Sequence, residues 1–305
     1  MRTTVTLGED GLIHNGNLEI MAAHGCNLVC RSCTHASPVL RPKDIADPTT
    51  TERDLARLAR CYRARRVKLL GGEPLLHPDL VGLAGAVRGS GITDNLTVVT
   101  NGVLLPRQGA AFWAAVDEVW VSIYPGFEPP DDEVTRWHAL AAEHSVTVTL
   151  HRYEQFRESH SEFGTSDGKL VKRIYDTCEI AHVWRCQAVI NGVFYKCPEA
   201  YFLPVLRGEE PRDGLVLTDD GSDADLRGRL LAYLNSTEPL YACRFCLGTV
   251  GKAFPHQQVR RKAWRAPQRK PTEELIDYPY LAEREQDLPD SYEWTAETTI
   301  LGANS

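Results

Sequence analysis

The stretch that decides the fold is Cys26-Asn27-Leu28-Val29-Cys30-Arg31-Ser32-Cys33, which directly follows a β-rich run at 18–23. It carries three thiols on one loop. Three thiolates can hold three corners of a cubane iron–sulfur cluster and leave the fourth iron open. A zinc site or three incidental core cysteines is the alternative, but structural zinc sites close four ligands around the metal. The loop therefore predicts a cluster with one open coordination position.

Strands and helices alternate along the chain beyond this loop. Such repeated strand–helix units predict a parallel sheet, with the active site where loops leave the carboxyl ends of the strands. We expect an α/β fold, an open partial (β/α) barrel of five to six parallel strands. The expected strands are 18–23, 67–70, 96–100, 118–124 and 146–150, and the expected helices are 51–64, 78–88, 108–116 and 133–144.

A second motif, Gly71-Gly72-Glu73-Pro74, follows the second expected strand. Taken alone it would be a plain turn, because Gly and Pro punctuate loops everywhere. Together with the Cys26–Cys33 loop, however, it resembles the radical S-adenosylmethionine (SAM) superfamily. The resemblance implies a [4Fe-4S] cluster on Cys26, Cys30 and Cys33 with SAM at the open iron. It also implies that Gly71, Gly72, Glu73 and Pro74 line the amino group of SAM.

Further SAM contacts are implied at the ends of the third and fourth expected strands. Thr100 and Asn101 follow the third strand and Ser122 lies near the end of the fourth. A simple turn at Asn101-Gly102 and a barrel-interior Ser122 are equally open interpretations. Ser32 departs from the family, in which the residue before the third cysteine is often aromatic and stacks near the adenine.

Two candidate catalytic residues, His151 and Arg152, close the fifth expected strand at the same rim. An arginine can hold a carboxylate or hydroxyl of a substrate, and a histidine can move protons near neutral pH. A structural role for either residue is the alternative.

A second group of cysteines follows the barrel. The turn-forming pair Asn191-Gly192 predicts a two-residue hairpin within this part. The pattern resembles the shortened SPASM, or twitch, domain, which implies a second [4Fe-4S] cluster held by four of the five thiols. We assign the ligands to Cys178, Cys197, Cys243 and Cys246 and leave Cys186 free as a hydrogen-atom donor. Cys178 and Cys186 could exchange these roles. A zinc ribbon is the main alternative to the second cluster.

These features divide the chain into four parts. We expect an N-terminal extension at 1–17, the partial barrel at 18–177, a twitch-like β-hairpin/α iron–sulfur domain at 178–250, and a wrapping segment with a tail at 251–305. The basic residues near 260–265 are expected to form a solvated face.

Composition narrows the choice of compartment and partner. A net charge of -7 provides no footprint for nucleic acid, and no apolar stretch is long enough to cross a membrane. Nine cysteines without a secretory signal indicate a reducing, cytoplasmic location.

The radical SAM resemblance implies removal of a hydrogen atom from an unactivated carbon. A single appended cluster is similar to enzymes of aminoglycoside and oligosaccharide antibiotic biosynthesis, so we expect a sugar, aminoglycoside or oligosaccharide substrate and a flavodoxin or ferredoxin reductant. The spare thiol favours epimerisation, with oxidation of an alcohol to a ketone close behind. Modification of a ribosomal peptide is a third possible reaction, disfavoured because we expect no peptide-recognition domain before residue 18. The non-catalytic alternative is an iron–sulfur protein that serves as an electron-transfer scaffold.

Overall fold

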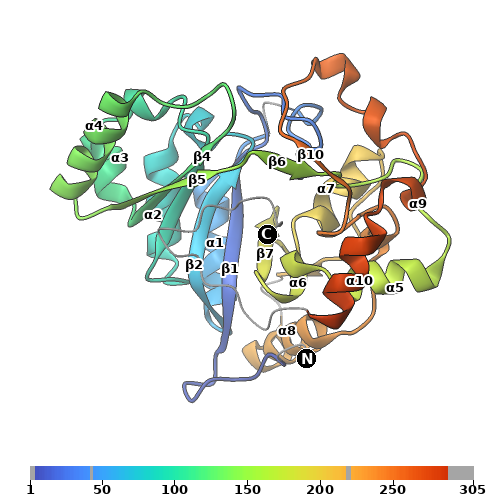
Figure 1. Cartoon of the computed structure of the whole chain (residues 1–305). Coiled ribbons are helices and arrows are strands. Elements are labelled where there is room, and N and C mark those ends of the chain that lie inside the picture. Colours follow the sequence, from blue (N-terminus) through green and yellow to red (C-terminus); the bar gives the residue numbers. More distant parts are fainter. Residues whose placement is uncertain (1–3, 42–43, 218–220, 288–305) are drawn as a thin grey trace.

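The computed structural model describes residues 4–41, 44–217 and 221–287. One eight-stranded sheet, in the order β5-β4-β3-β2-β1-β7-β8-β9, forms the centre, and β10 and β6 form a separate pair. Figure 1 shows the sheet running through the middle of the molecule. The strands are β1 (Ile13–Ala23), β2 (Tyr62–Gly71), β3 (Leu96–Thr100), β4 (Glu118–Ile123), β5 (Thr147–Arg152), β6 (Gln155–Arg157), β7 (Cys186–Ile190), β8 (Val193–Tyr195), β9 (Leu215–Val216) and β10 (Ala253–Pro255).

Six neighbouring strands of the large sheet are parallel. β1 to β5 pair in parallel in chain order, and β7 adds to the other side of β1 in parallel. This confirms the expected α/β fold with five to six parallel strands. The sixth strand is β7, the first strand of the hairpin that was expected in a separate domain, so the predicted boundary after residue 177 does not separate two sheets.

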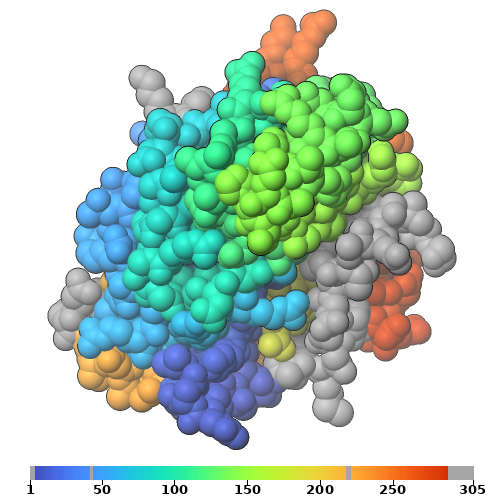
Figure 2. All heavy atoms as spheres, turned by 90° about the vertical axis from the view of Figure 1, so that its left-hand side faces the viewer, coloured from blue at the N-terminus to red at the C-terminus, as the bar shows by residue number. Residues whose placement is uncertain are grey.

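Helices cover the outer face of the parallel strands. Leu55 and Leu58 of α1, Leu83 of α2 and Trp113 of α3 are wholly buried against it. Asp47 caps α1 by accepting from the backbone N–H of Thr50, and Pro48 occupies its first turn. Teal to green atoms of this helical side occupy the middle and upper part of Figure 2. Its helices are α1 (Pro48–Ala59), α2 (Leu80–Gly89), α3 (Ala110–Ala115) and α4 (Asp131–Glu143).

The hairpin β7–β8 turns at Asn191 and Gly192, whose φ values are 52° and 74°. Two successive positive φ values are those of a type I′ turn, so the predicted hairpin is confirmed. The remaining helices are α5 (Gly168–Asp176), α6 (Glu179–His182), α7 (Glu199–Leu206), α8 (Asp223–Asn235), α9 (Thr272–Leu275) and α10 (Tyr278–Gln286). The short 3₁₀ turns are η1 (Pro74–Leu76), η2 (Leu105–Arg107), η3 (Tyr241–Arg244), η4 (Arg261–Ala263) and η5 (Ala266–Gln268).

Several expected boundaries shift in the structure. β1 begins at Ile13, because Ile13 is wholly buried and pairs with Tyr62, so the strand takes up part of the expected extension at 1–17. Cys61, expected on a helix, lies in the turn after α1, where its thiol donates to the carbonyl of Asp223. The part of the expected tail at 288–305 lies outside the described residues. No helix among the described residues is long and apolar enough to cross a membrane.

Candidate functional site

The Cys26–Cys33 loop leaves the carboxyl end of β1 and curls back on itself. Ser32 and Ala36 adopt positive φ values of 52° and 51°, which lets the chain turn tightly around the thiols. Burial, together with the nearby Cys33, raises the pKa of Cys26 and of Cys30 to about 12. Without a bound metal these buried sulfurs are therefore neutral thiols, and bound iron would deprotonate them.

Polar hydrogens point at the sulfurs of this loop. Asn101 Nδ2 lies 3.8 Å from Cys26 Sγ, and Gln258 Nε2 lies 3.1 Å from Cys30 Sγ. The backbone N–H of Leu28 also donates to Cys26 Sγ. Buried thiolates that accept such bonds are the usual ligands of iron–sulfur clusters. The three cysteines and their donors thus fit a cluster with three protein ligands.

The glycines of the second motif lie against the backbone that leads into the cluster loop. A Cβ on Gly71, whose φ is 133°, would lie 2.2 Å from the carbonyl oxygen of Ala23, and a Cβ on Gly72 would lie 2.1 Å from that of Gly25. The N–H of Gly72 donates to the carbonyl of Ala23 at 2.8 Å. Only glycine permits this approach, which holds the end of β2 against the start of the loop.

Glu73 is a wholly buried brace between strand ends. Its carboxylate accepts from Thr100 Oγ1 at 2.6 Å, from the N–H of Asn101 at 2.9 Å and from the N–H of Leu75 at 3.0 Å. Asn101 in turn donates to Asn27 Oδ1 at 2.7 Å. The expected SAM residues Glu73, Thr100 and Asn101 are therefore joined in one network under the cluster loop, and Pro74 begins η1 beside it.

Ser122 and His151 lie side by side in the register of β4 and β5, and both are buried. Burial lowers the pKa of His151 to about 4, and its ring meets Trp120 edge-on at 5.2 Å between centroids. Arg152 leaves β5 on the opposite side and is exposed. The structure thus brings His151, but not Arg152, to the same side of the sheet as Ser122.

Four thiols of the second group line one hollow. Cys178, Cys197, Cys243 and Cys246 come from the starts of α6 and α7 and from η3 and the residues after it. Gly248 packs against Cys178 so closely that a Cβ would lie 3.4 Å from its Sγ, and its φ is 54°. Burial raises the pKa of Cys178 and Cys243 to about 12.

Burial also raises the pKa of Glu199, a neighbour of these thiols missed by the sequence analysis, to about 7. Across the described residues, no three His, Cys, Asp or Glu side chains are arranged to hold a single metal ion.

Cys186 is not among the residues that line this hollow. It begins β7, where it pairs with Asn17, and it is buried against Cys178 and the residues of α6. Burial and the nearby Glu19 carboxylate both raise the pKa of its thiol. Glu19 is itself buried, with its Oε1 3.9 Å from Lys68 Nζ.

Within the expected wrapping segment, residues 254–268, which we call the strap, cross the cluster loop, and the sequence analysis did not foresee their contacts with it. Besides Gln258, Trp264 Nε1 donates to the carbonyl of Cys30 at 2.9 Å, and Gln268 Nε2 donates to Ser32 Oγ. Ser32 is buried and also donates to Glu158, which explains why an aromatic side chain is absent there. No spacing in the sequence relates the strap to the loop, because the two lie more than 220 residues apart.

Residues 20–167 match the family model described as Radical SAM superfamily. The chain is 33% identical over 107 residues to a GTP 3',8-cyclase of Chlorobaculum tepidum, covering 35% of this chain and 32% of that enzyme. It is 37% identical over 97 residues to molybdenum cofactor biosynthesis protein 1 of Bos taurus, covering 31% of this chain and 15% of that protein. These alignments thus span a third or less of each relative.

Among solved structures, the chain is similar to BtrN in complex with AdoMet and 2-DOIA, with 16% identity and a TM-score of 0.42 over 72% of this chain and 82% of that one. It is also similar to SuiB of Streptococcus suis bound to S-adenosylmethionine, with 14% identity and a TM-score of 0.40 over 71% and 68% of the two chains. The family implies a [4Fe-4S] cluster and SAM. On the match at 20–167, which contains the three-cysteine loop and the Gly71–Pro74 motif, the chain carries a radical SAM superfamily domain.

Proposed function

We propose that this chain is a two-cluster radical SAM enzyme that removes a hydrogen atom from a hydroxyl-bearing carbon of a sugar or cyclitol. The observation that carries the two-cluster part is the gathering of Cys178, Cys197, Cys243 and Cys246 around one hollow, apart from the Cys26–Cys33 loop. Four buried thiols can close a [4Fe-4S] cluster, whereas three leave one iron for SAM.

A cluster held by Cys26, Cys30 and Cys33, with SAM bound to it, would supply the radical chemistry that removes a hydrogen atom. The chain's own contribution is to hold the site. Gln258 and Asn101 donate to the ligand sulfurs, Glu73 ties the ends of β2 and β3 together, and Gly71 and Gly72 keep the backbone close to the loop. A flavodoxin or ferredoxin is the proposed reductant.

Oxidation of the alcohol to a ketone is the reaction that the geometry favours. Loss of the hydrogen atom, a hydroxyl proton and one electron balances this reaction, and the second cluster is the proposed acceptor of the electron. Epimerisation instead needs a thiol at the substrate. Cys186 pairs with Asn17, six residues before β1 ends at Ala23, which is roughly 20 Å of strand from the cluster loop.

Epimerisation remains the second candidate because Cys186 is a buried thiol that packs against Cys178 but does not line the hollow of the four other thiols. GTP is included as a test substrate because the relatives that share 30–37% identity include GTP 3',8-cyclases, and modification of a ribosomal peptide is the third alternative.

The test begins with iron. Anaerobically purified protein with Cys26, Cys30 and Cys33 all replaced by alanine should retain about four irons and four sulfides per chain. Retention of zinc alone, or of neither metal, would remove the second cluster from the proposal.

Product analysis in heavy water then separates the reactions. A ketone two mass units lighter than the substrate supports oxidation, and an isomer carrying solvent deuterium supports epimerisation through a thiol. Turnover of GTP or of a peptide, with no turnover of a sugar or cyclitol, would replace the proposed substrate class.

A further inference from the structure

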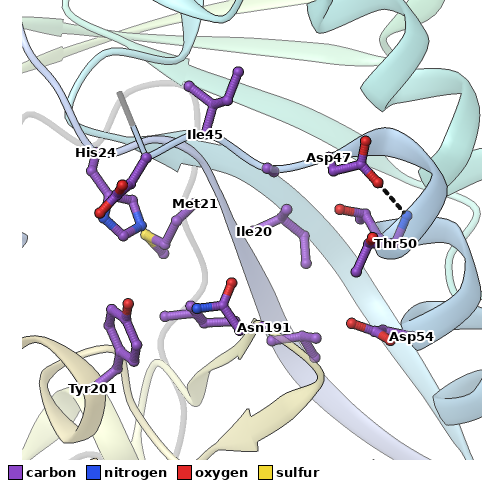
Figure 3. A pocket seen from close by; sticks show the side chains of 14 residues that line it. Ile20, Met21, His24, Ile45, Asp47, Thr50, Asp54, Asn191 and Tyr201 are labelled. Atoms are coloured by element: carbon purple, nitrogen blue, oxygen red, sulfur yellow. Dashed lines mark hydrogen bonds between the residues drawn. The ribbon is translucent and has the colours of Figure 1, made fainter. Parts of the chain in front are cut away.

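A pocket of about 470 Å³ lies in a fork of the large sheet. β1 and β7 pair only as far as Ile20 and Val189, after which β1 continues to Ala23 while β7 turns away at Asn191. The start of α1 and Tyr201 of α7 form the two sides of the opening, as Figure 3 shows. A volume of this size is typical of a site for a small molecule.

The polar part of the lining is acidic. Asp44, Asp47 and Asp54 line the pocket, and the part of the lining that the structure describes includes no lysine or arginine. Asp54 is buried and accepts two bonds from Arg53, whose side chain is 62% exposed. Asp47 accepts from the N–H of Thr50 at 2.8 Å, and that bond lowers its pKa. Three carboxylates thus line the pocket, with Arg53 beside Asp54 and Arg41 near Tyr201, and this balance of described charges favours a cationic ligand.

A second observation points to a ligand with hydrogen-bonding groups. His24 lines the pocket and is 8% exposed, and its ring packs edge-on against Tyr201 and Phe202. Its ring nitrogens make no hydrogen bond with any part of the chain that the structure describes. The imidazole ring has two nitrogens that can form hydrogen bonds with a ligand.

The rest of the pocket is apolar. Ile20, Met21, Val189 and Ile190 also line it and provide apolar surface on which the C–H face of a saturated ring can pack. His24 also lies two residues before Cys26, so the pocket adjoins the loop that holds the first cluster.

We propose that this pocket binds an amine-bearing polyol ring, an aminosugar or aminocyclitol, with the ammonium group at Asp44 and Asp47 and a hydroxyl at His24. This proposal rests on the sugar or cyclitol class of the proposed function and narrows it to cationic members.

The test uses anaerobically reconstituted enzyme and three sugars titrated by saturation-transfer NMR. Glucosamine carries the ammonium group, N-acetylglucosamine keeps the skeleton without the charge, and glucose lacks the nitrogen. We expect glucosamine to bind at least about tenfold more tightly than either neutral sugar, and the difference to shrink in high salt. Equal binding of all three, or saturable binding of none, would overturn the proposal.

Matched variants locate the site. Asparagine caps helices as well as aspartate, so Asp47→Asn removes a charge and keeps the start of α1 intact. The Asp44→Asn/Asp47→Asn double variant should weaken glucosamine binding about tenfold. Asp79→Asn makes the same change at the cap of α2, outside the pocket, and should leave binding unchanged. Equal losses in both proteins, or in neither, would contradict the assignment.

The two proposals fail separately. If the three-cysteine variant holds no iron, the two-cluster function is wrong whatever the sugars do. If iron content and reductive cleavage of SAM are normal but glucosamine does not bind, the aminosugar site is wrong and the two-cluster function stands.

Discussion

Replacing Gln258 with leucine is expected to lower the reduction potential of the first cluster. The Gln258 side chain donates to Cys30 Sγ at 3.1 Å, and its carbonyl oxygen accepts from the N–H of Val29 at 2.6 Å. A donor beside a ligand sulfur stabilises the reduced cluster more than the oxidised one, because reduction adds negative charge. Removing the donor therefore disfavours reduction.

The size of the effect follows from the strength of this bond. A hydrogen bond to a charged group contributes about 1.5–3 kcal/mol, and the added electron is spread over the whole cluster. If about a third of that energy depends on the oxidation state, the shift is 0.5–1 kcal/mol, or about 20–40 mV for one electron.

Spectroelectrochemical titration followed by EPR measures this potential directly. The exposed neighbour Gln257 provides the control, because Gln257→Leu makes the same change without touching a sulfur. Gln258→Glu keeps the acceptor for Val29, removes the N–H donor and sets a carboxylate near Cys30, so it should lower the potential further. An unchanged potential in Gln258→Leu, with full iron content, would refute the role of this bond.

The remaining predictions concern packing, ligation and pH. Gly71→Ala should prevent stable folding, because its Cβ would meet the Ala23 carbonyl at 2.2 Å. Gly85→Ala, at a position of α2 with open space around it, should instead raise the free energy of unfolding, measured in urea titrations, by up to about 1 kcal/mol. Cys178→Ser should remove about four irons, while Cys186→Ser should keep the full iron content; the reverse pattern would exchange their roles. Burial lowers the pKa of His160 from 6.5 to about 3. As the pH falls below about 6.5, the unfolded state therefore takes up a proton at this histidine before the folded state does, and the free energy of unfolding falls. His160→Gln should reduce that loss, measured in urea titrations, by up to about 1.4 kcal/mol per pH unit; an unchanged dependence of the unfolding free energy on pH would contradict this prediction.

The cysteine patterns were readable because their information is local. Cys26, Cys30 and Cys33 lie on eight consecutive residues after a strand, so their spacing brings the thiols together. The hairpin was equally local, since Asn191 and Gly192 accept positive φ values. The position of Cys186 was not readable, because it depends on β7 pairing with a strand about 170 residues earlier.

The sequence by itself determined the repeated strand–helix order, the three-thiol loop and the glycine motif after the second strand, because each depends on backbone preferences and spacing within a few residues. Tertiary structure decided that β7 extends the barrel sheet, that Gln258 reaches Cys30, and that Glu73 braces Thr100 and Asn101. It also decided that the fork between β1 and β7 leaves an acidic pocket beside His24. These features arise from contacts between segments far apart in the chain, whose meeting is set by the packing of the whole core and leaves no periodic signal in the sequence.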